Sequence, residues 1–525
     1  MLKQDLVEIV ERASTVEERL GGDFSPTGGN EAVVDKRLEA WCQALGKGDW
    51  DRLERRLAWD GLDLETVRPA LSPVRLRDGA ALPEWSLLLA EALRLAPPER
   101  REDEAWPAQM GFLDAEDPLP FEEVLAPFVL VARERLAGHT ASFEESPSEA
   151  ARASLERSLL RSLSSASGGL LLGEFEAMRA REQSSWDRMF ALAQDPEGRS
   201  LYRRFVRRLG EEGMARLLRR YPVLARQLGT ISQLWVEANA EFFGRLEADM
   251  PELERLFGDG NLGDVVELEP SLSDPHGGRR SVVALTFASG QKLVYKPKDM
   301  GTEAAYHRLL AWLNERGAPL PFKVLRVLDR PTHGWVEFVE HLPCRDQDEA
   351  RRYYERAGML LCLFYLLEGT DCHYENIIAS GEYPVLIDTE TLMHHRAEQA
   401  TQARAEMGRF PRLSRPERPV HFRQTRSAAC VSRLRRRGHE RHALACSASA
   451  SLATARRTLA EHVRTIAPPL QDRVPAWRAA RSQGIPGRQP PLAYANRRKV
   501  TSRLVVRRAA VSLGEKACPS PYIVD

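Results

Sequence analysis

The first half of the chain repeats apolar residues at helical spacing. In segments 120–136 and 201–228, apolar positions recur every three or four residues and charged residues fill the positions between them, a pattern typical of amphipathic helices. We therefore predict a largely helical region over residues 1–255. Loops are predicted where Gly, Pro and Ser cluster, at 21–29, 95–107 and 142–147.

The pattern changes after residue 258. Short runs of apolar and β-branched residues follow one another, separated by turn-forming residues, which predicts strands. The predicted strands are 265–268, 281–287, 292–296, 322–328, 334–339 and 383–387, and the predicted helices are 302–316 and 347–367. Strands interrupted by one helix, followed by a helical region, predict an α+β fold with the two-lobed layout of a kinase over residues 256–395.

A polar loop follows the second of these helices. It places Asp371 five residues before Asn376, the separation between the base and the metal-binding Asn in the catalytic loop of protein kinases. Asp388 follows 12 residues after Asn376, directly behind the predicted strand 383–387. In this interpretation Asp371 accepts a hydroxyl proton, while Asn376 and Asp388 hold Mg²⁺ on the phosphates of ATP. The alternative is a loop whose Asp and Asn side chains only cap backbone groups.

Three further residues extend this hypothesis. Lys296 ends a strand just after a hairpin turn, where a kinase places the lysine that contacts nucleotide phosphates; the alternative is a solvent-facing lysine. His373 is a candidate to shuttle a proton, to orient Asp371 or to contact phosphate, or else an ordinary core histidine. Glu390 shares a strand face with Asp388 if the strand continues, and would add another metal-binding carboxylate; otherwise it is a polar residue at a strand end.

A separate polar segment precedes the second predicted strand. The run Ser273-Asp-Pro-His-Gly-Gly-Arg279 contains Asp274, His276 and two glycines. Asp-Pro and Gly-Gly are turn formers, so the local residues alone favour a simple turn.

Composition excludes several classes of protein. The chain has 525 residues, 43% hydrophobic and 29% charged, which predicts several domains with ample core. The longest apolar run, 359–367, is too short to cross a bilayer, and the N-terminus lacks the order of a signal peptide, so we expect a cytoplasmic protein without a membrane span. Seven scattered cysteines without CxxC spacing indicate neither a disulfide framework nor a sequence-local zinc site.

The net charge of zero conceals an uneven distribution. Residues 396–525 contain 25 Arg and 2 Lys against 8 acidic residues, a net charge of +19, which leaves −19 on the rest of the chain. Such asymmetry is a usual sign of an acidic or nucleic-acid partner. This tail nearly lacks Lys and shows little sustained period, however, as a GC-rich gene translated out of frame would. We therefore predict an out-of-frame or truncated end, irregular or disordered, in preference to a disordered basic arm or a folded domain, and we do not expect nucleic acid as a partner.

Several motifs together resemble one known family. The segment GTDCHYENIIASGEYPVLIDTETL, with LVYKPKDM, SDPHGGRRSV and RRYPVLARQL upstream of it, is similar to the dehydratase domain of class II lanthipeptide synthetases, the LanM type. The resemblance covers roughly residues 190–395, extends more loosely to the helical start of the chain, and fades just after Leu392.

The resemblance implies a fold related to lipid kinases. It also implies an enzyme that uses ATP and Mg²⁺ to phosphorylate Ser and Thr of a leader-bearing precursor peptide, and then eliminates phosphate to form dehydroalanine and dehydrobutyrine. By motif position, the implied phosphorylation residues are Lys296, Asp371, His373, Asn376, Asp388 and Glu390. Asp274 and His276 correspond to residues linked to elimination, which reverses the local preference for a simple turn.

The chain also departs from this family. Elimination in the family needs an Arg and a Thr in a downstream segment of the form RxxxRxT. After the catalytic motifs, the nearest match here is 503–509, which has Ala509 in place of the Thr. No cysteine is followed by His at the spacing of a zinc site, so neither the cyclase domain of the family nor zinc is expected. We therefore expect phosphorylation, with elimination and cyclisation lost. The alternatives are a kinase-like phosphotransferase with another substrate, or a fragment that binds the leader peptide without catalysis.

Overall fold

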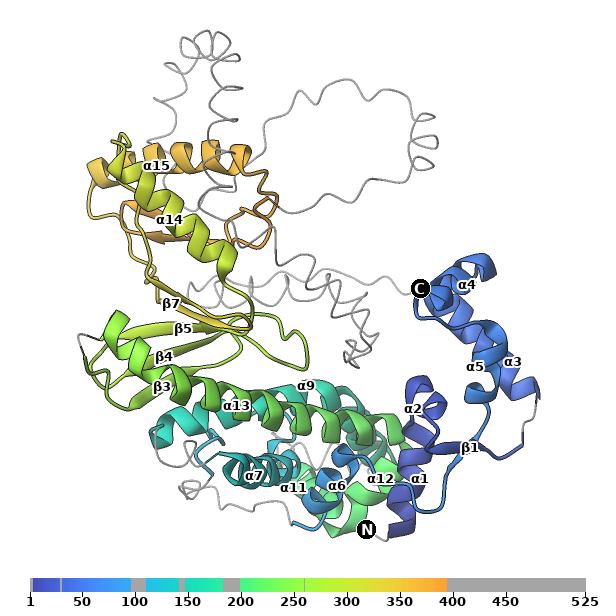
Figure 1. The fold of residues 1–525 in the computed structure, drawn as a ribbon. Helices are drawn as coiled ribbons and strands as arrows, with labels where there is room; N and C mark the ends of the chain where they lie inside the picture. The colour runs from blue at the N-terminus through green and yellow to red at the C-terminus, as the bar shows by residue number, and fades with distance from the viewer. Residues whose placement is uncertain are drawn as a thin grey trace, which may run out of the picture.

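The computed structural model describes residues 3–28, 31–95, 110–140, 147–182, 199–258 and 260–393. The predicted irregular tail, 396–525, lies outside the described residues, as do most of the predicted loops at 95–107 and 142–147. The described residues build a helical base, a β-sheet above it, and a second group of helices and strands beyond the sheet (Figure 1). The α+β prediction is confirmed.

Helices make up most of the first 258 residues, as the apolar period predicts. Segment 201–228 is not one helix, because the π-helical turn η3 interrupts it and a break at Tyr221 separates α12 from α13. Pro222 occupies the first turn of α13, where its missing N–H costs no hydrogen bond. The helices of this region are α1 (Lys3–Ala13), α2 (Val16–Leu20), α3 (Glu31–Trp41), η1 (Cys42–Gly46), α4 (Trp50–Trp59), α5 (Leu64–Leu71), α6 (Glu84–Ala92), α7 (Glu122–His139), α9 (Glu149–Glu182), α11 (Arg199–Arg208), η3 (Leu209–Gly213), α12 (Met214–Arg220) and α13 (Pro222–Phe257).

A two-stranded sheet lies within this helical region. β1 (Phe24–Pro26) pairs antiparallel with β2 (Val74–Leu76), although residues 21–29 were predicted to be a loop. Each strand has only three residues, and such a short segment shows no recognisable alternation of apolar and polar residues.

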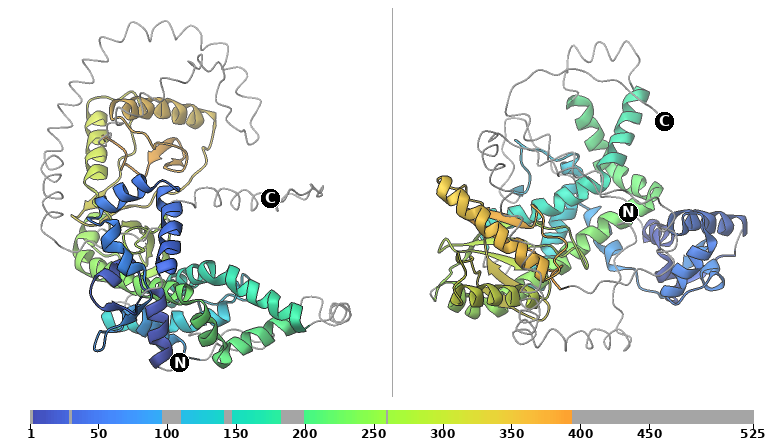
Figure 2. Two further views of the ribbon diagram at one scale, coloured as in Figure 1. Left: turned by 90° about the vertical axis from the view of Figure 1, so that its right-hand side faces the viewer. Right: turned by 90° about the horizontal axis from the view of Figure 1, so that it is seen from above.

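Helix α13 is the spine of the base. It contacts α1, α6, α7 and α9, and in Figure 1 it runs along the underside of the sheet. Gly229 permits the close approach of α6, since a side chain there would overlap the carbonyl oxygen of Trp85. The two further views show α9 and α11 reaching outward from the base as an arm (Figure 2). The long apolar face of α13 thus packs against both the other helices of the base and the sheet.

The main sheet has five antiparallel strands in the order β3-β4-β5-β7-β6. Its strands are β3 (Val265–Glu269), β4 (Val283–Phe287), β5 (Lys292–Lys296), β6 (Val327–Asp329) and β7 (Gly334–Glu337). The predicted strand 322–328 is largely wrong, because Phe322 is bonded to Asn314 at the end of α14 through both its N–H and its carbonyl, at 2.8 and 2.9 Å. The chain therefore runs beside α14 there and joins the sheet only at Val327.

The two faces of the sheet contact different parts of the molecule. Tyr295 packs against Phe242 of α13 and against Trp335 of β7, with ring centroids 5.0 and 4.9 Å apart. Val294 and Val336 point the opposite way and pack with Val385 from the second group of elements. Alternation along β5 therefore sends Lys296, next after Tyr295, away from α13.

The second group contains α14 (Gly301–Glu315), α15 (Gln347–Leu366), β8 (Ile377–Ser380) and β9 (Tyr383–Leu386). The last two strands form an antiparallel hairpin, of which only β9 was predicted. Arg356 of α15 is buried and donates to the carbonyl oxygens of Pro321 and Glu382 at 2.8 and 3.0 Å. Its guanidinium also lies over the ring of Tyr383. This arginine therefore ties α15 to the hairpin that follows the polar loop.

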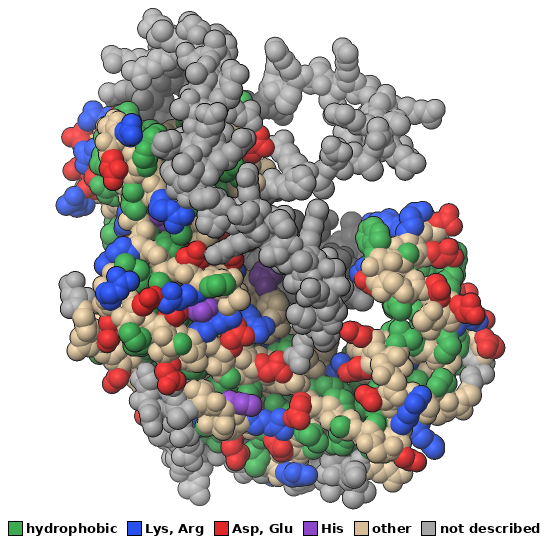
Figure 3. All heavy atoms as spheres, viewed as in Figure 1, with side chains coloured by type: hydrophobic (Ala, Val, Ile, Leu, Met, Phe, Trp, Pro, Cys, Tyr) green, Lys and Arg blue, Asp and Glu red, His purple; other side chains and the backbone are tan. Residues whose placement is uncertain are grey.

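The described surface is mixed in charge and apolar content. On the face drawn in Figure 3, acidic and basic side chains of the described residues are interspersed. Among the described helices, none has the length and apolarity to span a bilayer.

Candidate active site

Lys296 is buried between the sheet and α14. Its Nζ donates to both carboxylate oxygens of Glu303, at 2.9 and 2.8 Å, and to the backbone oxygen of Ile387 at 2.6 Å. Because Lys296 is only 6% exposed, the alternative of a solvent-facing lysine is wrong.

Glu303 is a site residue that the sequence patterns did not reveal. It lies in the first turn of α14 and is 2% exposed. Burial raises the pKa of its carboxyl group, and the charge of Lys296 opposes that rise. A strand lysine paired with a glutamate on the following helix is the arrangement that protein kinases use. The available signal was the one acidic residue in the first turn of the helix that follows the lysine.

Asp371, His373 and Asn376 share the polar loop between α15 and β8. The Nε2 of His373 lies 3.1 Å from the Oδ1 of Asp371, and its Nδ1 accepts the backbone N–H of Glu375 at 3.2 Å. Because Nδ1 is an acceptor, the ring proton lies on Nε2, which donates a hydrogen bond to Asp371. The side chains of Asp371 and His373 are 52% and 44% exposed, so His373 is not a core histidine and the carboxylate is open to a substrate.

The β8–β9 hairpin brings Asn376 close to Asp388. Ile377 pairs with Leu386, and one step further the backbone N–H of Ile387 donates to the carbonyl of Asn376 at 2.9 Å. The 12-residue separation in the sequence is thus the length of one hairpin. The Nδ2 of Asn376 donates to the backbone oxygen of Asp371 at 2.8 Å, which leaves the amide oxygen for another ligand.

Lys298 is a second cation of the site that the sequence patterns did not reveal. Its Nζ lies 3.0 Å from Asp388 Oδ1 and 3.3 Å from Glu390 Oε2. Burial by itself lowers the pKa of Lys298, but the two carboxylates outweigh that effect and hold the pKa above its usual value. The backbone N–H of Glu390 also donates to Asp388 Oδ1 at 3.2 Å. Asp388, Glu390 and Lys298 therefore form one charged cluster.

These oxygen donors fit a magnesium ion in kind. Two carboxylates, at 388 and 390, and the amide oxygen of Asn376 are hard oxygen ligands, and Mg²⁺ in nucleotide sites is held by one or two carboxylates together with substrate phosphates. Within the described ranges, no group of three His, Cys, Asp or Glu side chains is assembled to bind a metal ion without such help. Asn376, Asp388 and Glu390 are thus the candidate oxygen ligands of this site.

Comparison with known proteins supports the resemblance. Residues 221–416 match a family described as "Domain of unknown function (DUF4135)". A curated relative, the lacticin 481/lactococcin biosynthesis protein LcnDR2 of Lactococcus lactis subsp. lactis, is 36% identical over 129 residues. The resemblance to class II lanthipeptide synthetases is confirmed.

These matches cover part of each protein. The alignment with the Lactococcus relative spans 23% of this chain and 14% of that protein. The family match continues to residue 416, beyond Leu392, where we expected the likeness to the synthetases to end.

Asp274 and His276 lie in the connection between β3 and β4. The backbones of His276 and Arg280 bond to each other at 2.8 and 2.9 Å, closing a tight turn, so the turn prediction is confirmed locally. Arg280 donates to Glu241 of α13 at 3.0 Å, and Arg279 donates to Ser162 of α9 at 2.7 Å. These contacts anchor the turn to the helical base, while both Asp274 and His276 are exposed.

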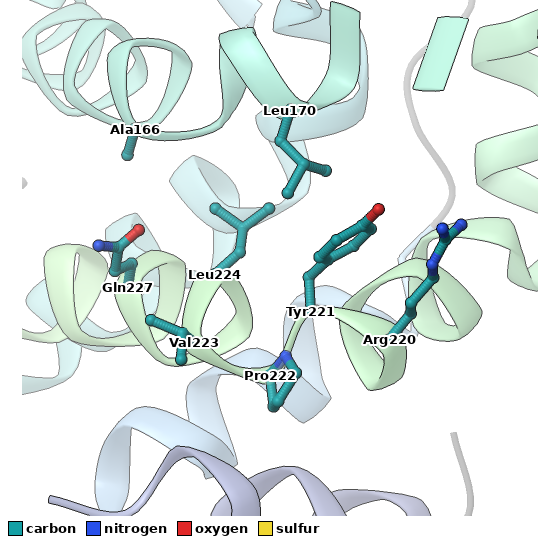
Figure 4. A pocket seen from close by; sticks show the side chains of 8 residues that line it. All are labelled: Ala166, Leu170, Arg220, Tyr221, Pro222, Val223, Leu224 and Gln227. Carbon is teal, nitrogen blue, oxygen red and sulfur yellow. The ribbon is translucent and has the colours of Figure 1, made fainter. Parts of the chain in front are cut away.

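A cavity lies in the helical base, among other elements than those of the charged cluster. A hollow of about 340 Å³ opens between α9 and the start of α13. Figure 4 shows Leu170 of α9 facing Tyr221 and Leu224 across it. The charged cluster instead lies at the junction of β5, α14 and the hairpin, and shares no lining residue with this cavity.

His307 gives this junction a pH dependence. It lies one turn after Glu303 on α14, and its Nδ1 accepts the backbone N–H of Leu325 at 3.2 Å. Burial and then the charge of Lys296 lower the pKa of His307 to about 4 from an ordinary value of 6.5. The unfolded chain therefore binds a proton that the folded chain excludes, so the stability from this site is complete above pH 6.5 and is lost as pH falls toward 4.

We expect this histidine to cost about 2 kcal/mol of unfolding free energy at pH 5 relative to pH 8. Urea unfolding of the wild type and of His307→Gln at pH 5 and pH 8 measures how much the unfolding free energy of each protein changes between the two pH values. The Gln variant should lose about 2 kcal/mol less than the wild type on going from pH 8 to pH 5. An equal loss of unfolding free energy in both proteins would contradict the prediction.

Proposed function

We propose that this chain transfers phosphate from ATP to Ser and Thr hydroxyls of a precursor peptide, as the first step of dehydration in lanthipeptide biosynthesis. The similarity to a lantibiotic biosynthesis protein and the DUF4135 match point to that pathway. One observation carries the kinase chemistry: Lys296, paired with Glu303, bonds to the backbone of Ile387, directly before Asp388. The phosphate-contacting lysine and the metal-binding carboxylate of a kinase would then be neighbours.

The polar loop would act on the acceptor hydroxyl. Asp371 accepts the hydroxyl proton while the hydroxyl oxygen bonds to the γ-phosphorus and the bond from that phosphorus to the β-phosphate oxygen breaks, releasing ADP. His373 holds the Asp371 carboxylate in place through the 3.1 Å contact. The partial exposure of both side chains leaves room for a peptide to approach.

Asn376, Asp388 and Glu390 would hold Mg²⁺, which when bound neutralises charge on the phosphates. Lys296 would place its charge beside the same phosphates, and Glu303 keeps that side chain extended into the site. The precursor peptide and ATP are thus the proposed partners, and the cytoplasm is the expected location.

Asp274 and His276 would act beside the phosphates. The β3–β4 connection contains Gly277 and Gly278 and lies one strand before the lysine strand, which is the place of the glycine-rich loop that covers phosphates in kinases. The family's elimination role for these residues needs an RxxxRxT segment downstream of the catalytic loop, and none follows Asp388 in the printed sequence. We therefore propose the phosphorylated peptide as the product.

Mass spectrometry tests this proposal. The full chain is incubated with ATP, Mg²⁺ and a lanthipeptide precursor peptide that contains Ser and Thr. A phosphate adduct on Ser or Thr, without loss of water, is expected. ATP consumption without a peptide adduct would favour a phosphotransferase with another acceptor. Peptide binding without ATP consumption would leave only the leader-binding alternative, and either result would overturn the proposal.

A further inference from the structure

Lys298 occupies the position where a cation is needed between two carboxylates. It follows Lys296 by two residues, in the bend after β5, and both side chains reach the segment 387–390. Its Nζ lies 3.0 Å from Asp388 and 3.3 Å from Glu390. Two carboxylates that share a site repel each other unless a positive charge lies between them.

The two lysines differ in how many of their N–H donors are unused. A lysine ammonium has three N–H donors, and Lys296 uses three bonds, two to Glu303 and one to Ile387. Lys298 makes two, to Asp388 and Glu390. Its side chain is 39% exposed, against 8% for Lys296. Lys298 is therefore the cation at this junction with a donor and with space to move.

We propose that Lys298 is a resident counter-ion of the Asp388–Glu390 pair. It holds the two carboxylates together before a metal ion binds, releases them when Mg²⁺ arrives with the nucleotide, and then donates to a nucleotide phosphate. This inference rests on the proposed function, and it adds a residue that positions the metal ligands. The flexible four-carbon stem of lysine permits the change of partner.

The surrounding charges support an exchange of cations. Glu303, Asp388 and Glu390 contribute three negative charges, against two from Lys296 and Lys298. Without Lys298 the junction would carry one more unbalanced negative charge, which favours a divalent cation. The partial exposure of Lys298 and Glu390 also means that these contacts add little to folding stability. Neutralising Lys298 should therefore change metal binding without unfolding the protein.

Binding of Mn²⁺ in the absence of nucleotide tests the counter-ion role directly. Free Mn²⁺ is followed by electron paramagnetic resonance as the full-length chain is titrated. Lys298→Met should bind Mn²⁺ about three- to tenfold more tightly than the wild type, because the ion no longer competes with a lysine. Lys298→Arg keeps the charge and should stay close to the wild type. With nucleotide present, Lys298→Met should bind ATP more weakly.

Lys292→Met is the matched control. Lys292 is the first residue of β5 and pairs with the single carboxylate of Glu340 at 3.5 Å, with an exposure similar to that of Lys298. Its loss should leave Mn²⁺ affinity unchanged. Melting temperatures verify that each variant is folded, and Lys298→Gln replaces the Met variant if that one is not.

Asp388→Asn separates the two ways in which the inference can fail. If Mn²⁺ binding is insensitive to Asp388→Asn in every background, the metal-site assignment fails and the proposed function fails with it. If Asp388→Asn weakens Mn²⁺ binding but Lys298→Met and Lys298→Gln do not tighten it, only the counter-ion role of Lys298 is overturned. Equal tightening in Lys292→Met would also overturn it.

Discussion

Asp388→Asn is expected to lower the rate of phosphate transfer to the precursor peptide by about 10²–10³-fold, as expected when one group that stabilises transition-state charge is removed. The substitution keeps the shape of the side chain and removes its charge. Asp388 lies at the end of the β8–β9 hairpin and contacts Lys298 and the backbone N–H of Glu390, so the backbone of the site should persist. Single-turnover assays with radiolabelled ATP measure the rate.

Asp348→Asn is the control for this change. Asp348 lies in the first turn of α15, is 71% exposed and pairs only with Arg351 among the contacts found in the described chain. Its substitution removes the same charge outside the site and should leave the transfer rate unchanged. An Asp388→Asn enzyme as fast as Asp348→Asn would remove Asp388 from the metal-binding set.

Lys296→Met is expected to destabilise the protein by about 3–5 kcal/mol and to abolish transfer, because breaking a buried ion pair leaves an uncompensated charge. Glu303 is 2% exposed and would lose the only ammonium that contacts it in the described structure. The backbone oxygen of Ile387 would lose its 2.6 Å bond at the same time. Urea unfolding and the single-turnover assay measure the two effects.

The double variant Lys296→Met with Glu303→Leu separates stability from chemistry. Replacing both members of a buried ion pair by apolar residues is often neutral or stabilising, so the double variant should recover most of the lost unfolding free energy. It should not recover phosphate transfer, since the charge beside the phosphates is still absent. Recovered transfer would show that Lys296 only supports the fold, and Lys292→Met again provides the surface control.

Local patterns in the sequence identified most of the elements around the site. β5 was predicted at 292–296 and lies there, and α15 differs from its predicted bounds by one residue at its C-terminal end. These elements bury one face against the rest of the protein, and that burial imposes the period that the sequence displays. The short strands β1 and β2 and the strand β8 were missed because a few residues carry too little of that period.

The sequence by itself determined the order of the site residues, with Lys296 before Asp371, Asn376 and Asp388, and the spacing typical of a kinase. Only the tertiary structure decided which of them meet. Lys296 bonds to Ile387, 91 residues away, and Lys298 bonds to Asp388, 90 residues away, while Asp274 and His276 lie in a turn anchored on the helical base. Glu303 became a site residue because the first turn of α14 lies beside the end of β5, where Lys296 bonds to it. Such contacts depend on how separate elements pack, and no local periodicity records them.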